Sequence, residues 1–276
     1  FLMKFFKPKF WDKRGGISLF SILLLPLSLI TIIKNYYENN KIKKNFYDFR
    51  TICVGNIYIG GTGKTPLVNN LASHFKKKFK TFIVKKNYPS HLDEKRLLES
   101  RHKVIFEKTR LLSLSKAEQE KAELIIFDDG LQEKIINYDL KIVCFNSMKL
   151  DGNGLVIPAG PLRERLNSLK DYDIVFINGN INKKSKDFVN IIQKINPDIR
   201  IFTGRYVPKN YANLKRKKFF IFSGIGNSHT FSDTLKGIKI KFNGYKKFPD
   251  HYNYQESDLQ KLKELAKLKG CELLTT

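Results

Sequence analysis

Residues 51–66 read TICVGNIYIGGTGKTP, an apolar β-branched run that leads into a glycine-rich loop and a Lys-Thr pair. In this order of elements, glycines allow backbone N–H groups to turn toward phosphate oxygens at the N-terminus of a helix. Lys64 can reach the β- and γ-phosphates of a nucleotide, and the Thr65 hydroxyl is placed to bind Mg²⁺. The stretch therefore predicts a strand, a phosphate-binding loop and a helix, with ATP and Mg²⁺ as the ligands.

The loop departs from the usual phosphate-loop pattern at one position. The pattern requires a glycine five residues before Gly63, and this chain has Tyr58 there. Pro66 is compatible with the first turn of a helix, where its missing N–H has no partner to lose. The alternative is a glycine-rich turn beside a solvated lysine. We expect the phosphates to be bound by Gly60, Gly61, Thr62, Gly63, Lys64 and Thr65.

Short apolar runs alternate with helix-like stretches along the chain. Near-continuous apolar runs of this length are typical of buried parallel strands, and their alternation with helices indicates an α/β protein. The predicted fold is a P-loop NTPase-like doubly wound sheet, with an N-terminal membrane helix and a second, smaller α/β domain. The runs that predict its strands are residues 51–54, 81–84, 124–127, 141–145 and 173–177.

Two carboxylates, Asp128 and Asp129, follow the third of these runs. They come where a strand would end, and the carboxyl ends of parallel strands form the ligand-binding edge of such a sheet. Enzymes with a phosphate-binding loop hold Mg²⁺ at this place, often through water. A plain turn is the alternative, because an Asp-Gly pair favours one. We expect Thr65, Asp128 and Asp129 to hold the metal.

An uncharged, mostly aliphatic segment covers residues 15–33, between Arg14 and Lys34. As a helix it would be about 28 Å long, close to the ~30 Å hydrocarbon core of a bilayer. Pro26 would kink this helix, which a membrane tolerates better than a soluble helix does. Basic residues flank both ends, so charge does not fix an orientation, and a helix lying at the interface is an open alternative. We predict a membrane anchor at residues 15–33.

The net charge and the cysteine content indicate which partners and which cellular location to expect. The net charge of +25 would suit nucleic acid or an anionic surface, but the lysines are spread along the whole chain. No nucleic-acid-binding motif accompanies them, so we expect membrane lipids and no nucleic acid as partners. Cys53, Cys144 and Cys271 stand singly in apolar stretches, without the spacing of a metal site or a secreted disulfide framework. This usage indicates a reducing, cytosolic environment.

The chain is predicted to have three parts. They are a membrane-anchoring helix with its basic flank at residues 1–34, a nucleotide-binding domain at 35–214 and a smaller C-terminal α/β domain at 215–276. The last part opens with the apolar run FFIF at residues 219–222 and continues the strand-helix-strand rhythm through residues 238–240. The final residues, CELLTT, look like a strand entering a loop, so we expect the chain to be truncated after Thr276.

Five segments stand in an order that is specific to one family. Through them the chain resembles the tetraacyldisaccharide 4'-kinases, the lipid A 4'-kinases of Gram-negative bacteria, over nearly its whole length. The resemblance implies transfer of the ATP γ-phosphoryl group to the 4'-hydroxyl of a tetraacylated glucosamine disaccharide 1-phosphate. It also implies a location at the cytoplasmic face of the bacterial inner membrane. The segments are VGN leading into GGTGKTP (54–66), FDDGLQ (127–132), PAGPLRE (158–164), SGIGN (223–227) and FPDHY (248–252).

The resemblance also implies catalytic residues. The family pairs a catalytic aspartate with a histidine, which correspond to Asp93 and His251 here, and the histidine would orient the carboxylate. Without the resemblance, His251 is simply one histidine in a turn. Arg163 would bind phosphate beside Lys64, because a guanidinium group binds phosphate through two N–H groups. The alternative for Arg163 is a surface ion pair with Glu164 or another neighbour.

Three departures from the family pattern put part of this assignment in question. Residues 85–91 read KKNYPSH where the family usually carries Ser-Arg-Gly-Tyr-Gly-Arg, and the stretch before Asp93 is shorter. Lys95 stands where the family has proline, and Glu133 where it usually has histidine. Two other classes therefore stay open. One is a membrane-associated P-loop ATPase that acts as a switch or partitioning factor, and the other is a structural membrane adaptor with a degenerate nucleotide site.

Overall fold

The structure is a computed structural model that describes residues 7–14, 16–40, 47–86, 92–207, 211–225, 228–249 and 252–276. Contacts divide the chain into two compact units, Phe1–Gly204 and Arg205–Thr276. The three-part division predicted from the sequence, at residues 1–34, 35–214 and 215–276, stays a prediction.

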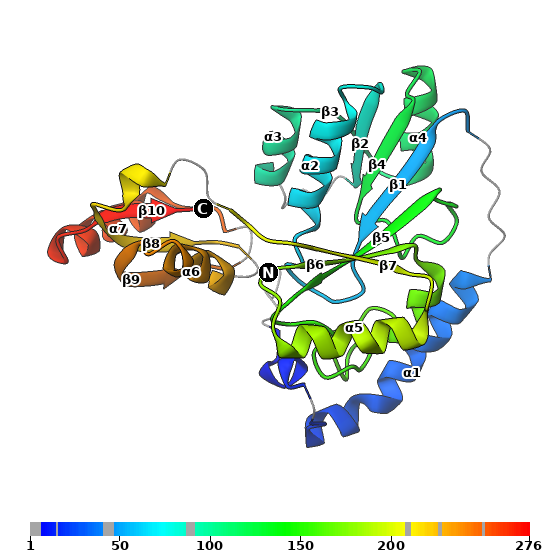
Figure 1. The fold of residues 1–276 in the computed structure, drawn as a ribbon, viewed down its shortest axis with the longest axis horizontal. Helices are drawn as coiled ribbons and strands as arrows, with labels where there is room; N and C mark the ends of the chain where they lie inside the picture. Colours follow the sequence, from blue (N-terminus) through cyan, green and yellow to red (C-terminus); the bar gives the residue numbers. More distant parts are fainter. Residues whose placement is uncertain are drawn as a thin grey trace. The chain divides into compact units, whose positions relative to one another are not determined.

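The described part of the first unit is built on a parallel sheet of seven strands, in the order β3-β2-β4-β1-β5-β6-β7 (Figure 1). Each described pairing between neighbouring strands is parallel. The doubly wound α/β sheet is therefore confirmed, and its ligand-binding edge is the one where the strands end. The strands are β1 (Arg50–Gly55), β2 (Thr81–Lys86), β3 (Lys103–Glu107), β4 (Leu124–Asp128), β5 (Leu140–Asn146), β6 (Ile174–Asn178) and β7 (Arg200–Gly204).

Helices cover both faces of this sheet. Successive side chains of a strand point to opposite faces of the sheet. On one face, Val54 of β1 packs in a cluster with Val68 of α2. On the other face, Cys53 of β1 lies in a cluster with Leu114 of α4 and Phe188 of α5. Burial on both faces explains why the five inner strands are apolar without alternation. The helices of this unit are α1 (Leu19–Asn39), α2 (Lys64–Phe75), α3 (Leu92–Glu99), α4 (Arg110–Gln119) and α5 (Lys183–Ile195), with short 3₁₀ helices at Lys9–Asp12 and Leu166–Asp171.

Helix α1 turns a polar stripe toward the protein and its apolar side chains outward. Ser21, Ser28 and Asn35 are seven residues apart and so share one face. The two serines are buried, Ser28 Oγ donates to the carbonyl of Val156 at 2.8 Å, and Asn35 Nδ2 donates to the carbonyl of Arg163 at 2.8 Å. The exposed apolar side chains of α1 are Leu19, Phe20, Ile22, Leu23, Leu25, Leu27, Leu29, Ile30 and Ile33.

The segment Leu19–Glu38 of α1 is long and apolar enough to cross a membrane, by length and composition. Only 11% of the apolar stretch of this helix is buried inside the protein, whereas the core helix of a soluble protein is mostly buried. The apolar N-terminal helix predicted from the sequence is confirmed, with Pro26 inside it. Its attachment to a membrane stays a proposal.

In the described part of the second unit, three parallel strands form a sheet in the order β10-β8-β9. Phe219 and Ile221 of β8 pack on one face of this sheet, and Phe220 and Phe222 pack on the other. The strand-helix-strand rhythm predicted here is confirmed, but its second strand begins only at Lys241, because Lys239 has φ +61°, outside the extended region. The elements are β8 (Lys218–Ser223), α6 (Ser228–Gly237), β9 (Lys241–Lys247), α7 (Glu256–Leu268) and β10 (Glu272–Thr275), preceded by a 3₁₀ helix at Ala212–Leu214.

Candidate active site

The glycine-rich loop connects β1 to α2 and contains two glycines in the left-handed region. Gly60 has φ +115°, and Gly63, the N-cap of α2, has φ +86°, so a side chain at either position would be strained. Asn56 is buried at the start of the loop, and its Nδ2 donates to the carbonyl of Gly60 at 3.2 Å. Its Oδ1 accepts from Lys64 Nζ at 3.1 Å. One amide side chain therefore fixes both the loop and the lysine.

Tyr58 stands where the usual pattern has its first glycine, and its pairing explains the difference. Tyr58 is buried and forms an antiparallel bridge with Leu162. The neighbouring Ile59 N–H donates to the carbonyl of Pro161 at 2.9 Å. This part of the loop thus pairs like a strand with the segment that carries Arg163, and position 58 needs no glycine.

The side chains predicted to bind phosphate and metal meet at the end of β4. Thr65 Oγ1 donates to Asp128 Oδ2 at 3.1 Å. Lys64 Nζ lies 3.7 Å from Asp129 Oδ2, and Arg163 Nη1 donates to Asp129 Oδ1 at 2.9 Å. The fold thereby brings together residues that are about a hundred positions apart in the sequence.

Three cations surround the Asp129 carboxylate. Burial raises the pKa of Asp129, but Lys64, Arg163 and Arg110 together lower it, and the net effect holds the pKa below its ordinary value. Asp129 also has φ +67°, a left-handed conformation that Asp adopts more readily than most residues. The carboxylate is therefore ionised at neutral pH and able to bind a cation.

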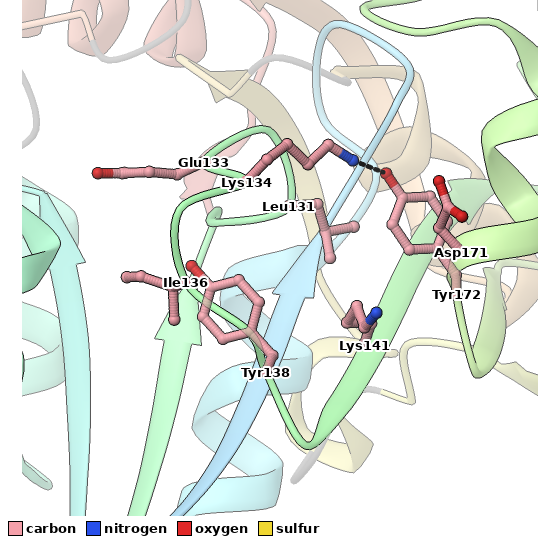
Figure 2. Close-up of a pocket in the computed structure, with 8 residues that line it drawn as sticks. All are labelled: Leu131, Glu133, Lys134, Ile136, Tyr138, Lys141, Asp171 and Tyr172. Atoms are coloured by element: carbon pink, nitrogen blue, oxygen red, sulfur yellow. Dashed lines mark hydrogen bonds between the residues drawn. The ribbon is translucent and has the colours of Figure 1, made fainter. Parts of the chain in front are cut away.

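The buried carboxylate of Glu164 holds Gln132 in place, and Gln132 in turn binds Arg163. Gln132 donates through Nε2 to Glu164 Oε1 at 2.9 Å, and its Oε1 accepts from Arg163 Nη1 at 2.9 Å. Glu164 Oε2 accepts from Lys134 Nζ at 3.2 Å and from the Tyr172 hydroxyl at 3.1 Å. Figure 2 shows Lys134 and Tyr172 reaching toward each other at the cavity they line. The ion partner of Glu164 is thus Lys134, and Arg163 pairs at the site instead.

Arg110 and Glu133 form a second support that sequence reasoning missed. Arg110 is the first residue of α4 and is buried, and its guanidinium group contacts the Glu133 carboxylate and the carbonyl of Asp129. Glu133 is one of the departures from the family pattern, and here it belongs to an ion pair that holds the loop after β4. A single arginine at a helix start carries no signal of such a role in the sequence.

Two of the predicted catalytic residues are not placed relative to this site. His251 lies outside the described residues. Asp93 is the second residue of α3, which follows β2 in the chain, but its side chain is outside what the structure describes. The pairing of Asp93 with His251 stays a prediction.

The donor atoms at the end of β4 and in the glycine-rich loop suit Mg²⁺. Asp128 Oδ1 and Thr62 Oγ1 are buried without a hydrogen-bond partner in the described parts of the chain. A buried oxygen of this kind is costly unless a ligand satisfies it. Within the described residues, no group of three His, Cys, Asp or Glu side chains could hold a metal. Mg²⁺ needs no such group, since it commonly binds one or two carboxylates together with substrate phosphates.

A parallel sheet whose first strand leads into this loop is the architecture of P-loop nucleotide-binding proteins, and the chain falls into that class. The family model described as Tetraacyldisaccharide-1-P 4'-kinase matches residues 20–276. The chain belongs to this family.

Relatives and a solved structure agree with this assignment. A tetraacyldisaccharide 4'-kinase of Pelagibacter ubique is 44% identical over 286 residues, covering 99% of this chain and 87% of the relative. The protein of the same name from Rickettsia akari is 37% identical, covering 100% and 87%. A crystal structure of LpxK from Aquifex aeolicus, described as an "apo" form in complex with ATP, has a TM-score of 0.66 at 23% identity and covers 94% of this chain and 88% of that one. This last likeness shows a shared fold.

Proposed function

We propose that the protein is an ATP-dependent kinase of lipid A biosynthesis that phosphorylates the 4'-hydroxyl of a tetraacylated glucosamine disaccharide 1-phosphate. Family membership over residues 20–276 supports this proposal. The observation that carries it is the convergence of Lys64, Asp129 and Arg163 at the end of β4. An ATPase switch or partitioning factor is not favoured, because named kinases match almost the whole chain.

Each side chain of the site would have a separate role. Phosphoryl transfer needs positioning and charge neutralisation more than covalent chemistry. Lys64 and the N–H groups of residues 60–65 would hold the β- and γ-phosphates of ATP. Arg163 would bind the transferred phosphoryl group through two N–H groups. Its contacts with Asp129 and Gln132 support this role, because they hold the guanidinium group at the site before substrate binds.

Thr65, Asp128 and Asp129 would hold Mg²⁺. A bound Mg²⁺ supplies charge neutralisation on the phosphate oxygens. The lowered pKa of Asp129 and the unpartnered Oδ1 of Asp128, among the described residues, support the assignment.

A direct assay tests the proposed function. The purified protein is incubated with Mg-ATP and a tetraacyldisaccharide 1-phosphate acceptor, and products are separated by thin-layer chromatography and mass spectrometry. We expect a bisphosphorylated lipid whose formation requires both substrates. ATP hydrolysis that does not depend on the acceptor would contradict the kinase and favour the ATPase switch, while no turnover of either kind would favour the adaptor.

Replacing Asp93 with alanine should lower turnover about a hundredfold and leave ATP binding nearly unchanged. The reason is that Asp93, which His251 would orient, would accept the proton of the attacking 4'-hydroxyl group, so its contact would be with the acceptor and not with the nucleotide. Steady-state turnover and ATP titration measure the two effects separately. Glu99→Ala in the same helix is the matched control. An unchanged rate in Asp93→Ala would remove this residue from the mechanism.

We infer that α1 attaches the protein to the membrane by lying along its surface. The serine and asparagine stripe of α1 contacts the segment that carries Arg163, and the opposite face exposes leucine and isoleucine. A helix that crossed the membrane alone would have no need of these polar contacts to its own protein. An acylated substrate stays in the bilayer, which favours attachment, and the family resemblance implies the cytoplasmic face of the bacterial inner membrane as the location.

Replacing Leu23 and Ile30 together with glutamate should weaken binding to lipid vesicles at least about tenfold, because both apolar side chains would leave the bilayer. These side chains are 67% and 65% exposed, so the fold should be unaffected. Vesicle co-sedimentation measures the binding, and circular dichroism checks the fold. Leu112→Glu on α4 is the control, with a side chain 53% exposed. Equal binding of the double variant and the unmodified protein would contradict the proposed orientation of α1.

A further inference from the structure

Strand β2 carries a lysine for which the proposed mechanism has no role. Lys85 lies opposite Asp128 in the parallel pairing of β2 with β4, so the register of the sheet makes them neighbours. The Lys85 ammonium group lies 2.6 Å from Asp128 Oδ2, and the two side chains are 9% and 1% exposed. The proposed metal site therefore contains a buried ion pair.

This ion pair needs a physical reason. An ammonium group is strongly disfavoured in a buried position unless a carboxylate compensates it, and well-packed apolar side chains are often at least as stable there. The strand before Lys85 is apolar, with Phe82, Ile83 and Val84 all buried. Lys85 is also the first residue of the segment 85–91, in which the sequence departs from the family pattern.

The two oxygens of Asp128 have different surroundings. Oδ2 accepts from both Lys85 Nζ at 2.6 Å and Thr65 Oγ1 at 3.1 Å. Oδ1 is buried and has no hydrogen-bond partner among the described residues. Lys85 thus neutralises Oδ2. Oδ1 is left to bind a cation, either directly or through a water molecule of that cation.

We propose that Lys85 is an internal counter-ion of the metal site, which neutralises Asp128 while no divalent cation is bound and weakens the binding of a free cation there. The inference rests on the metal role proposed for Asp128. Two cations at one carboxylate repel each other, and this repulsion is strong where water is excluded. The phosphates of ATP bring negative charge that offsets it. The site thus takes Mg²⁺ together with ATP and disfavours Mg²⁺ alone.

Titration of the protein with Mn²⁺, followed by electron paramagnetic resonance, tests the proposal. We expect Lys85→Met to bind Mn²⁺ alone at least about tenfold more tightly than the unmodified protein does. With a non-hydrolysable ATP analogue present, the difference should shrink. Lys86→Met is the matched control, since it removes the same charge from the next, exposed position of the strand, and its affinity should be unchanged. Equal affinities in Lys85→Met and the unmodified protein would overturn the proposal.

A second measurement covers the case in which Lys85→Met does not fold, because Asp128 would be left buried and unpaired. In protein labelled with ¹⁵N-lysine, the Lys85 ammonium resonance is assigned by its absence in Lys85→Arg. It should shift when Mg²⁺ and the ATP analogue bind, and a resonance that stays in place at saturation would overturn the proposal.

The same titrations separate this inference from the proposed function. If the unmodified protein binds no Mn²⁺ even with the ATP analogue, the metal role of Asp128 fails and the inference fails with it. If the analogue brings Mn²⁺ but Lys85→Met and the unmodified protein do not differ in any condition, only the inference fails.

Discussion

Replacing Lys64 with methionine should lower the turnover of the proposed kinase reaction about a thousandfold. Lys64 is the cation that would neutralise the negative charge on the β- and γ-phosphates during transfer. Its ammonium group is already held at the site, since it donates to Asn56 Oδ1 at 3.1 Å and lies 3.7 Å from Asp129 Oδ2. Methionine keeps most of the side-chain volume and removes the charge, so the loss would come from electrostatics and not from packing.

The measurement is turnover with saturating acceptor, accompanied by ATP titration and thermal unfolding. Lys77→Met is the matched control. Lys77 follows α2 and is exposed, and its replacement removes the same charge. We expect Lys77→Met to keep full turnover and Lys64→Met to unfold cooperatively near the temperature of the unmodified protein. Turnover of Lys64→Met within threefold of the control would contradict the phosphate-binding role of the loop.

Five of the seven strands described in the first unit follow from apolar runs, and the two that were missed have a common physical cause. Strands β3 and β7 are the edges of the sheet, and their residues are mostly half-buried or exposed. Their sequences, KVIFE and RIFTG, accordingly carry charged or small polar residues and lack a long apolar run. An edge strand is defined by its pairing with a neighbour, which a single sequence does not reveal.

The site shows the same division between local and long-range signals. Lys64, Thr65 and the Asp128-Asp129 pair were predicted because each belongs to a local pattern next to a strand. The pairing of Arg163 with Asp129 depends on the bridge between Tyr58 and Leu162, and no spacing rule encodes that contact.

The counter-ion Lys85 illustrates what a departure from a family pattern can conceal. The sequence suggested only that residues 85–91 had lost the arginines of the family. The register of β2 against β4 puts the Lys85 ammonium group beside Asp128. This neighbour depends on strand pairing, which the sequence of residues 85–91 alone does not show.

Replacing Arg163 with alanine should lower kcat/KM about a thousandfold, the usual scale for an arginine that stabilises a transferred phosphoryl group. It should also move the acid limb of the pH profile to higher pH. The sign follows from Asp129, whose pKa is held down by Lys64, Arg163 and Arg110 against the effect of burial. Without the Arg163 guanidinium group the pKa of Asp129 rises, so the carboxylate is protonated at a higher pH and loses its cation there. Arg165→Ala, on an exposed position of the same segment, should change neither quantity.

Arg163→Lys separates the two effects, because lysine keeps the positive charge and loses the planar pair of N–H donors. The acid limb should return toward its original position, since a cation again stands near Asp129. The rate should stay about a hundredfold low, since a single ammonium group cannot replace two parallel bonds to phosphate. Recovery of both the rate and the pH profile would show that charge alone is needed, and the two-bond phosphate role would be wrong. Failure of the acid limb to move in Arg163→Ala would instead show that Asp129 does not control it.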